Sequence, residues 1–196
     1  MGEETFYHLR GQTVTLTTKA DVEEGYPGDS DVAIERGSDV PLNSIVQLAS
    51  MICGTPMSTV TVLDGAKQKH KAKVGVDGWE TPREHAFCVY TIEGNEMFIV
   101  PDARLDERFK DNPLVTGPPN IRFYAGVPIR SPEGRAIATL CVLDRVPRTL
   151  SGDQSGALEM LSLQVASRFE SLRLAQGGVP LHLEDRRIRK PRSGEK

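Results

Sequence analysis

Apolar side chains recur at the three- and four-residue steps of a helix face near both ends of the central part of the chain. The first stripe begins at Pro41, which suits the first turn of a helix, and ends before Gly54. The second follows Ser151, where Ser-Gly-Asp-Gln matches a capping box, and stops before a Gly-Gly pair at 177–178. We predict two amphipathic helices, over positions 41–53 and about 151–175. Their apolar positions are Leu42, Ile45, Val46, Ala49, Ile52 and Cys53, and then Leu158, Leu161, Val165, Phe169 and Leu172.

Between these helices the pattern changes to the two-residue alternation of strands. Positions 58–63 alternate and are closed by an Asp-Gly turn, and a shorter alternation covers 13–17. Positions 122–129 and 136–143 flank Ser-Pro-Glu-Gly at 131–134, which favours a hairpin with a type I turn. Alternation in the first arm places only apolar residues on one face, and it places Arg122, Tyr124 and Gly126 on the other. The first face is typical of core, and the second is typical of a binding surface.

Lysines occupy every second position from Lys67 to Lys73, so a regular strand places four ammonium groups on one face. We interpret this run as an edge strand that lysines protect against pairing with another chain. The alternative is a strip that binds phosphate groups.

The order of elements is helix, strands, a long irregular middle, hairpin and helix. This order predicts an α+β fold with a central antiparallel sheet and both terminal helices on one face. The 196 residues divide into an acidic, partly flexible extension at 1–38, a charge-balanced domain at 39–176 and a basic, disordered tail at 177–196. A charge-balanced domain argues against nucleic acid as a partner. No apolar run is long enough for a membrane span, and three widely spaced cysteines fit a reducing, cytoplasmic location.

The segments at 81–92, 97–109, 111–117, 121–129 and 134–144 together resemble a GAF domain, of the type found in bacterial sensor histidine kinases and diguanylate cyclases. The resemblance implies a PAS-like sheet whose free face is covered by the irregular middle, with a small-molecule pocket between them. It also implies a homodimer that pairs through the terminal helices and passes a signal to a partner protein.

The second face of the hairpin carries the preferred ligand contacts, Arg122 and Tyr124, because a few convergent polar groups orient a ligand in an apolar pocket. Arg122 has the alternative of pairing with an aspartate of the loop. Thr139 and Cys141 on the neighbouring strand are expected near the same cavity. The full set of candidate ligand-binding residues is His85, Cys88, Asp102, Arg104, Phe109, Asn112, Arg122, Tyr124, Thr139 and Cys141.

The long connection at 81–121 supplies the other candidates. Charges alternate in sign at positions 102, 104, 106 and 108, which fits either a loop held by ion pairs or side chains that reach the pocket. Phe109 is expected to fill the core, and Asn112 to shape the rim through turn chemistry. His85 and Cys88 are too few ligands for a metal, so we expect no metal and a buried Cys88 in a short covering helix.

No Ser-His-Asp order, paired acid and base or glycine-rich phosphate loop is present, and we expect neither an enzyme nor a cofactor. The leading interpretation is a stand-alone sensory module that binds a small molecule. One alternative is a dimerisation or adaptor module whose pocket is filled by its own side chains. A further alternative, also from a GAF relative, is an enzyme like free methionine sulfoxide reductase, which needs an attacking thiol and a resolving partner within disulfide range.

Overall fold

The computed structural model describes residues 4–9, 12–17 and 37–176, and within them an antiparallel six-stranded sheet carries helices on both faces. The order of its strands is β5-β4-β3-β8-β7-β6. A separate pair joins β1 (Glu4–Leu9) to β2 (Gln12–Thr17), which includes the strand predicted at 13–17. Most of the predicted acidic extension and all of the tail at 177–196 lie outside the described residues.

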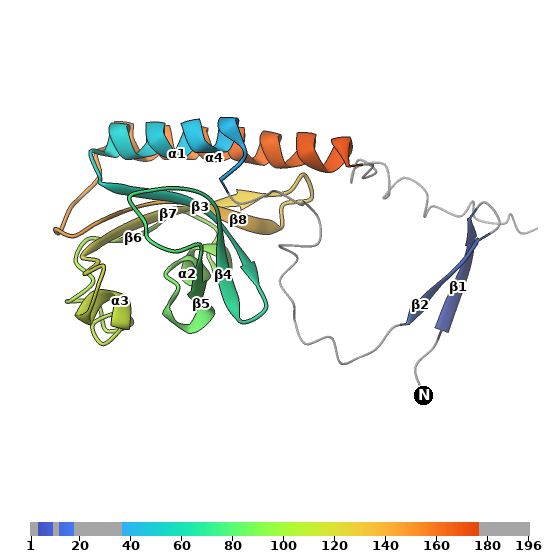
Figure 1. The fold of residues 1–196 in the computed structure, drawn as a ribbon, viewed down its shortest axis with the longest axis horizontal. Coiled ribbons are helices and arrows are strands. Elements are labelled where there is room, and N and C mark those ends of the chain that lie inside the picture. Colours follow the sequence, from blue (N-terminus) through green and yellow to red (C-terminus); the bar gives the residue numbers. More distant parts are fainter. Residues whose placement is uncertain (1–3, 10–11, 18–36, 177–196) are drawn as a thin grey trace, which may run out of the picture.

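The α+β fold predicted from the pattern is confirmed (Figure 1). Helices α1 and α4 lie along one side of the sheet, and α2 and α3 lie on the other. The strands of the sheet are β3 (Met57–Asp64), β4 (Lys67–Val74), β5 (Glu80–Pro82), β6 (Phe98–Val100), β7 (Phe123–Arg130) and β8 (Ala136–Asp144). The helices are α1 (Val40–Cys53), a 3-10 helix (Arg83–His85), α2 (Cys88–Glu93), α3 (Pro113–Thr116) and α4 (Gly152–Ala175).

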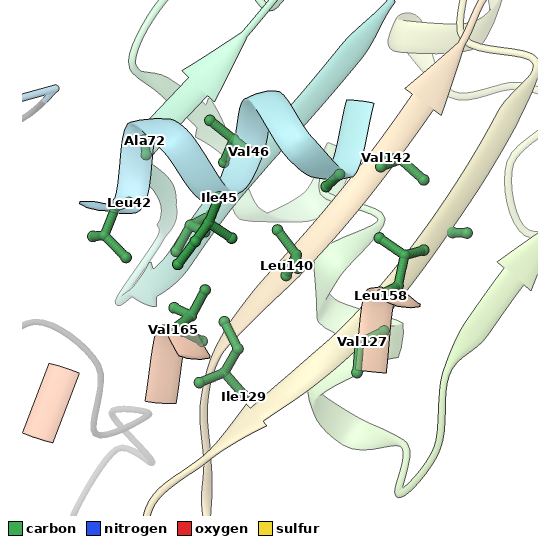
Figure 2. Close-up of a cluster of buried hydrophobic side chains, with 14 of the residues drawn as sticks. Leu42, Ile45, Val46, Ala72, Val127, Ile129, Leu140, Val142, Leu158 and Val165 are labelled. Carbon is green, nitrogen blue, oxygen red and sulfur yellow. The ribbon is translucent and has the colours of Figure 1, made fainter. Parts of the chain in front are cut away.

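The helix-side core joins the stripes of both terminal helices to one face of the sheet (Figure 2). Apolar residues at every second position of β7 and β8 point to this side, as the alternation predicted. Burying aliphatic side chains of this size stabilises the fold by roughly 1.5–3 kcal/mol each. The members of this core that Figure 2 labels are Leu42, Ile45, Val46, Ala72, Val127, Ile129, Leu140, Val142, Leu158 and Val165.

Polar contacts at both ends of α1 fix its direction relative to α4. The buried Asp39 carboxylate accepts a hydrogen bond from the Leu42 backbone N–H as the N-cap of α1, and it also pairs with the Arg168 guanidinium at 2.8 Å. At the other end, Gln154 Nε2 donates to the Ile52 carbonyl at 3.0 Å. The start of α1 therefore meets the later turns of α4, so the two helices run antiparallel.

The lysine-rich strand differs from its prediction in two ways. First, β4 is not an edge strand, because β5 pairs with it along Lys67–Lys69. Second, its register against β3 shifts between the pairs Thr61–His70 and Val60–Ala72, which leaves Lys71 as a bulge. A bulge reverses the faces of the residues beyond it, so the four lysines do not share one side of the sheet.

Within the part of the chain that the structure describes, no helix combines the length and the apolar character needed to cross a membrane.

The double role of Asp39 predicts graded losses of stability. Asp39→Ala removes the helix cap and the ion pair, and we expect it to lower the free energy of unfolding by about 2 kcal/mol. Asp39→Asn keeps a capping oxygen, so its loss should be about half as large. Urea unfolding of the three proteins measures both values. Equal losses in the two variants would contradict the capping role.

Candidate functional site

A cavity of about 460 Å³ lies on the sheet face opposite α1 and α4. Its floor consists of side chains from β3, β4, β7 and β8, and its cover consists of segments at 76–88 and 114–121. Lys73 holds part of this cover, because its ammonium donates to the carbonyls of Val76 at 2.8 Å and Gly78 at 2.6 Å. The floor residues are Met57, Thr59, Gln68, His70, Tyr124, Cys141 and Leu143.

His70 is a buried imidazole on this floor. The Thr59 hydroxyl lies 2.8 Å from His70 Nδ1 and donates to the Ala72 carbonyl at 2.9 Å. Because that hydroxyl has one proton, Nδ1 is the donor in the pair, and Nε2 keeps its lone pair. Burial, helped by the charge of Lys73, lowers the pKa of His70 to about 4. At neutral pH the cavity therefore contains an uncharged imidazole that can accept a hydrogen bond.

Gln68 lies two residues earlier on the same strand face, and only 6% of its surface is exposed. Its side chain belongs to the lining of the cavity, and its buried Oε1 atom has no hydrogen-bond partner among the described residues. A buried amide oxygen left without a donor costs about 1–3 kcal/mol. A ligand that supplies an N–H or O–H group would recover this energy.

Two buried thiols form another part of the wall. Cys88 Sγ lies 3.8 Å from Cys141 Sγ, and the hydroxyls of Thr61 and Tyr124 lie 3.3 Å and 3.5 Å from the Cys88 sulfur. Hydrogen bonds to that sulfur, above all the one from Cys141, lower the pKa of Cys88 to about 6 against the opposing effect of burial. The same pairing and burial raise the pKa of Cys141 well above its usual range.

Tyr124 is fully buried, and its phenol serves the protein itself. Its hydroxyl lies 2.6 Å from Thr91 Oγ1, and its ring stacks on Phe87 with centroids 5.2 Å apart. The space beside Gly126 is occupied by this phenol, since a Cβ there would lie 2.2 Å from the Tyr124 oxygen. Phe109 fills the core as expected and stacks on Phe87 at 4.1 Å.

Four of the predicted residues instead stabilise the loops around the cavity. Arg122 donates to the carbonyls of Val115 and Ile121, so it holds the cover in place. Asn112 caps α3 and donates to the His85 carbonyl at 3.0 Å. Asp102 pairs with Arg104 at the surface, and this partner lowers the pKa of the carboxyl.

The last two predicted residues also contact other groups. Thr139 shares a hydrogen bond of 2.6 Å with Thr61, and the His85 ring lies 3.5 Å from the Glu84 carboxylate. The structure therefore brings three of the ten predicted residues to the cavity, namely Cys88, Tyr124 and Cys141. Sequence reasoning missed Gln68 and His70. The signal was their alternation with the lysines of β4, which places both on the strand face opposite Lys67 and Lys69.

A family model of the GAF domain matches residues 39–169. A cyclic di-GMP phosphodiesterase of Pseudomonas aeruginosa is 41% identical over 141 residues, which are 71% of this chain and 24% of that protein. The chain thus spans about a quarter of the length of this curated relative.

Two solved structures share the fold at low sequence identity. The GAF domain of a phosphoenolpyruvate-protein phosphotransferase from Coxiella burnetii is 14% identical, with a TM-score of 0.59 over 69% of this chain and 84% of that one. A free methionine-R-sulfoxide reductase from Neisseria meningitidis is 17% identical, with a TM-score of 0.56 over 68% of this chain and 78% of that one. At these identities the likeness establishes the fold alone.

The expectation that the protein is not an enzyme is wrong by this comparison, because the relative at 41% identity is an enzyme. The resemblance of positions 81–144 to a GAF domain is confirmed, and the comparisons do not show the diguanylate cyclase type. The chain belongs to the GAF domain family, a family of sensory and regulatory modules.

Proposed function

We propose that this GAF domain binds a small molecule in the cavity beneath its sheet and transmits occupancy through α1 and α4. The observation that carries the proposal is the unpartnered amide oxygen of Gln68, a buried residue of the cavity lining that lies two positions from a neutral His70. Of the predicted residues, we assign Tyr124 and Cys141 to the floor of the site and Cys88 to its cover. The roles of Arg122 and Asn112 are to position its cover.

The walls favour a compact ligand that is partly apolar and donates hydrogen bonds. A volume of about 460 Å³ lies in the range of cavities that hold small molecules. Asp77, Glu80 and Arg145 are the charged residues on the walls, so they provide no surplus of positive charge. A doubly charged anion such as cyclic di-GMP fits these walls poorly. Apolar contacts come from Met57, Val76, Phe87, Leu114, Ile121 and Leu143.

The test of the site combines ligand screening with Gln68→Leu. We expect a compound from a panel of amino acids, nucleobases and cyclic nucleotides to raise the thermal unfolding temperature of the full chain. Gln68→Leu should abolish that rise. It should also make the free protein about 1–2 kcal/mol more stable, because the variant no longer buries an unpartnered oxygen. Gln47→Leu, at an exposed position of α1, is the matched control.

If no compound stabilises the protein and Gln68→Leu is less stable than the wild type, the amide has a structural role and the ligand proposal fails. The adaptor interpretation would then be favoured.

Exposed apolar side chains on the outer surface of the terminal helices support a homodimer. On α1 they are Leu48, Met51 and Ile52, and Met51 is 76% exposed. On α4, Met160 and Leu163 are 63% and 67% exposed, and their spacing is that of one helix face. A second copy of the chain would cover this strip with an identical strip.

Charge substitution in the strip tests the dimer. We expect Met51→Glu and Leu163→Glu to weaken self-association by about tenfold or more, because dimerisation would bury an unpaired carboxylate. Light scattering across a concentration series measures the self-association of each protein. Leu105→Glu is the matched control, since Leu105 is 81% exposed in the loop between β6 and α3. A wild-type chain that stays monomeric at all concentrations would refute the dimer.

We further propose that the domain regulates cyclic di-GMP turnover. Support comes from the relative in Pseudomonas aeruginosa, whose similarity covers 71% of this chain but only 24% of that phosphodiesterase. The remaining length of the relative has room for a catalytic region that such a domain controls.

A chimera tests the regulatory role. The similar segment of the phosphodiesterase is replaced by residues 39–176 of this chain, and hydrolysis of cyclic di-GMP is measured with and without the stabilising compound. We expect a change in rate of about fivefold or more, the usual scale of coupling between sites. The same chimera with Gln68→Leu should keep its basal rate and lose the response. An active chimera whose rate of hydrolysis is the same with and without the compound would contradict the proposal. The full chain alone is assayed in parallel for hydrolysis of cyclic di-GMP.

A further inference from the structure

Cys88 and Cys141 come from distant parts of the chain and face each other inside the cavity. Cys88 is the first residue of α2, Cys141 lies in β8, and their sulfurs are 3.8 Å apart. A disulfide bond is about 2.05 Å long, so the sulfurs need to approach by less than 2 Å. Both residues line the same cavity, which gives a small oxidant a route to buried thiols.

The surroundings of the two thiols give them different reactivity. Cys88 receives hydrogen bonds from Thr61 and Tyr124, and these favour its thiolate, the nucleophilic form. The pKa of Cys141 is raised, so it stays protonated and can donate a hydrogen bond to that thiolate. The pair therefore has the asymmetry of an attacking thiol and a resolving thiol.

Cys53 provides an internal contrast. It is buried on the helix side of the sheet, among the apolar residues of α1. Burial raises its pKa to about 11. Cys53 is therefore expected to react far more slowly than Cys88.

We propose that Cys88 and Cys141 form a reversible disulfide when hydrogen peroxide enters the cavity. The Cys88 thiolate attacks one peroxide oxygen, the O–O bond breaks, and Cys88 becomes a sulfenic acid while hydroxide leaves. The Cys141 sulfur then attacks the Cys88 sulfur, the S–O bond breaks, and water leaves with the Cys141 proton. In total, two thiols and one peroxide give one disulfide and two waters.

Formation of this bond alters the floor of the cavity. Cys88 moves toward β8 and takes the start of α2 with it, and the Tyr124 hydroxyl loses the thiol that accepts its hydrogen bond. The oxidised protein thus has a differently shaped pocket from the reduced one. The inference stands on the thiol geometry and does not need the ligand proposal.

The test uses the reduced full chain treated with a modest molar excess of hydrogen peroxide. The chain contains three cysteines, so we expect three thiols before treatment and one afterwards, counted by alkylation under denaturing conditions. Peptide mapping should join Cys88 to Cys141 within one chain, and dithiothreitol should restore all three thiols. The result that overturns the proposal is retention of three thiols under conditions that oxidise glutathione, or a bridge that involves Cys53.

Single variants test the assigned roles. Cys141→Ala should accumulate a sulfenic acid on Cys88 that dimedone traps. In the Cys88→Ala variant, the Cys141 thiol should be oxidised about tenfold more slowly than the Cys88 thiol is in the wild type. Cys53→Ala is the matched control and should form the disulfide at the wild-type rate. If Cys88 in the Cys141→Ala variant and Cys141 in the Cys88→Ala variant are oxidised at equal rates, Cys88 is not the attacking thiol.

Discussion

Both faces of the sheet need to be kept from water, and the rest of the molecule follows from this constraint. Strands β3, β7 and β8 are buried along almost their whole length. One face is covered by two long helices whose apolar side chains join those of the sheet in one core. The other face is covered by segments within 76–121 whose α-helices, α2 and α3, have only six and four residues. Such segments satisfy many of their backbone groups with side chains, and the cavity forms where they do not fill the space against the sheet.

The bulge at Lys71 decides which chemistry that cavity contains. Without it, strand alternation would place Ala72 on the same side as Gln68 and His70. The shift lets Ala72 join the helix-side core while the two polar residues stay in the cavity. One extra residue in a strand thus allows a single sequence to serve an apolar core at one end and a polar site at the other.

The sequence predicted helices and strands best where a clear hydrophobic period coincided with a signal that starts or ends the element. The helix after Ser151 and the hairpin around 131–134 form where the pattern placed them, because capping and turn chemistry act locally. Strand β4 was misinterpreted as an edge, because its partner β5 has three residues and no period of its own. The site was predicted only in part. Alternation found Tyr124 and Cys141, but the pairing of Cys88 with Cys141 spans 53 positions and depends on how α2 docks.

The two terminal helices differ in length, with 14 residues in α1 and 24 in α4. Since a helix rises about 1.5 Å per residue, α4 is longer than α1 by about 15 Å, and Figure 1 shows it extending past the start of α1. Phe169 is the last buried residue of α4 in the core, and Leu172 is the last that packs against it. The residues beyond Leu172 therefore extend past the part of the helix that the core holds. A tilt of α4 too small to break this packing displaces that end by a larger distance.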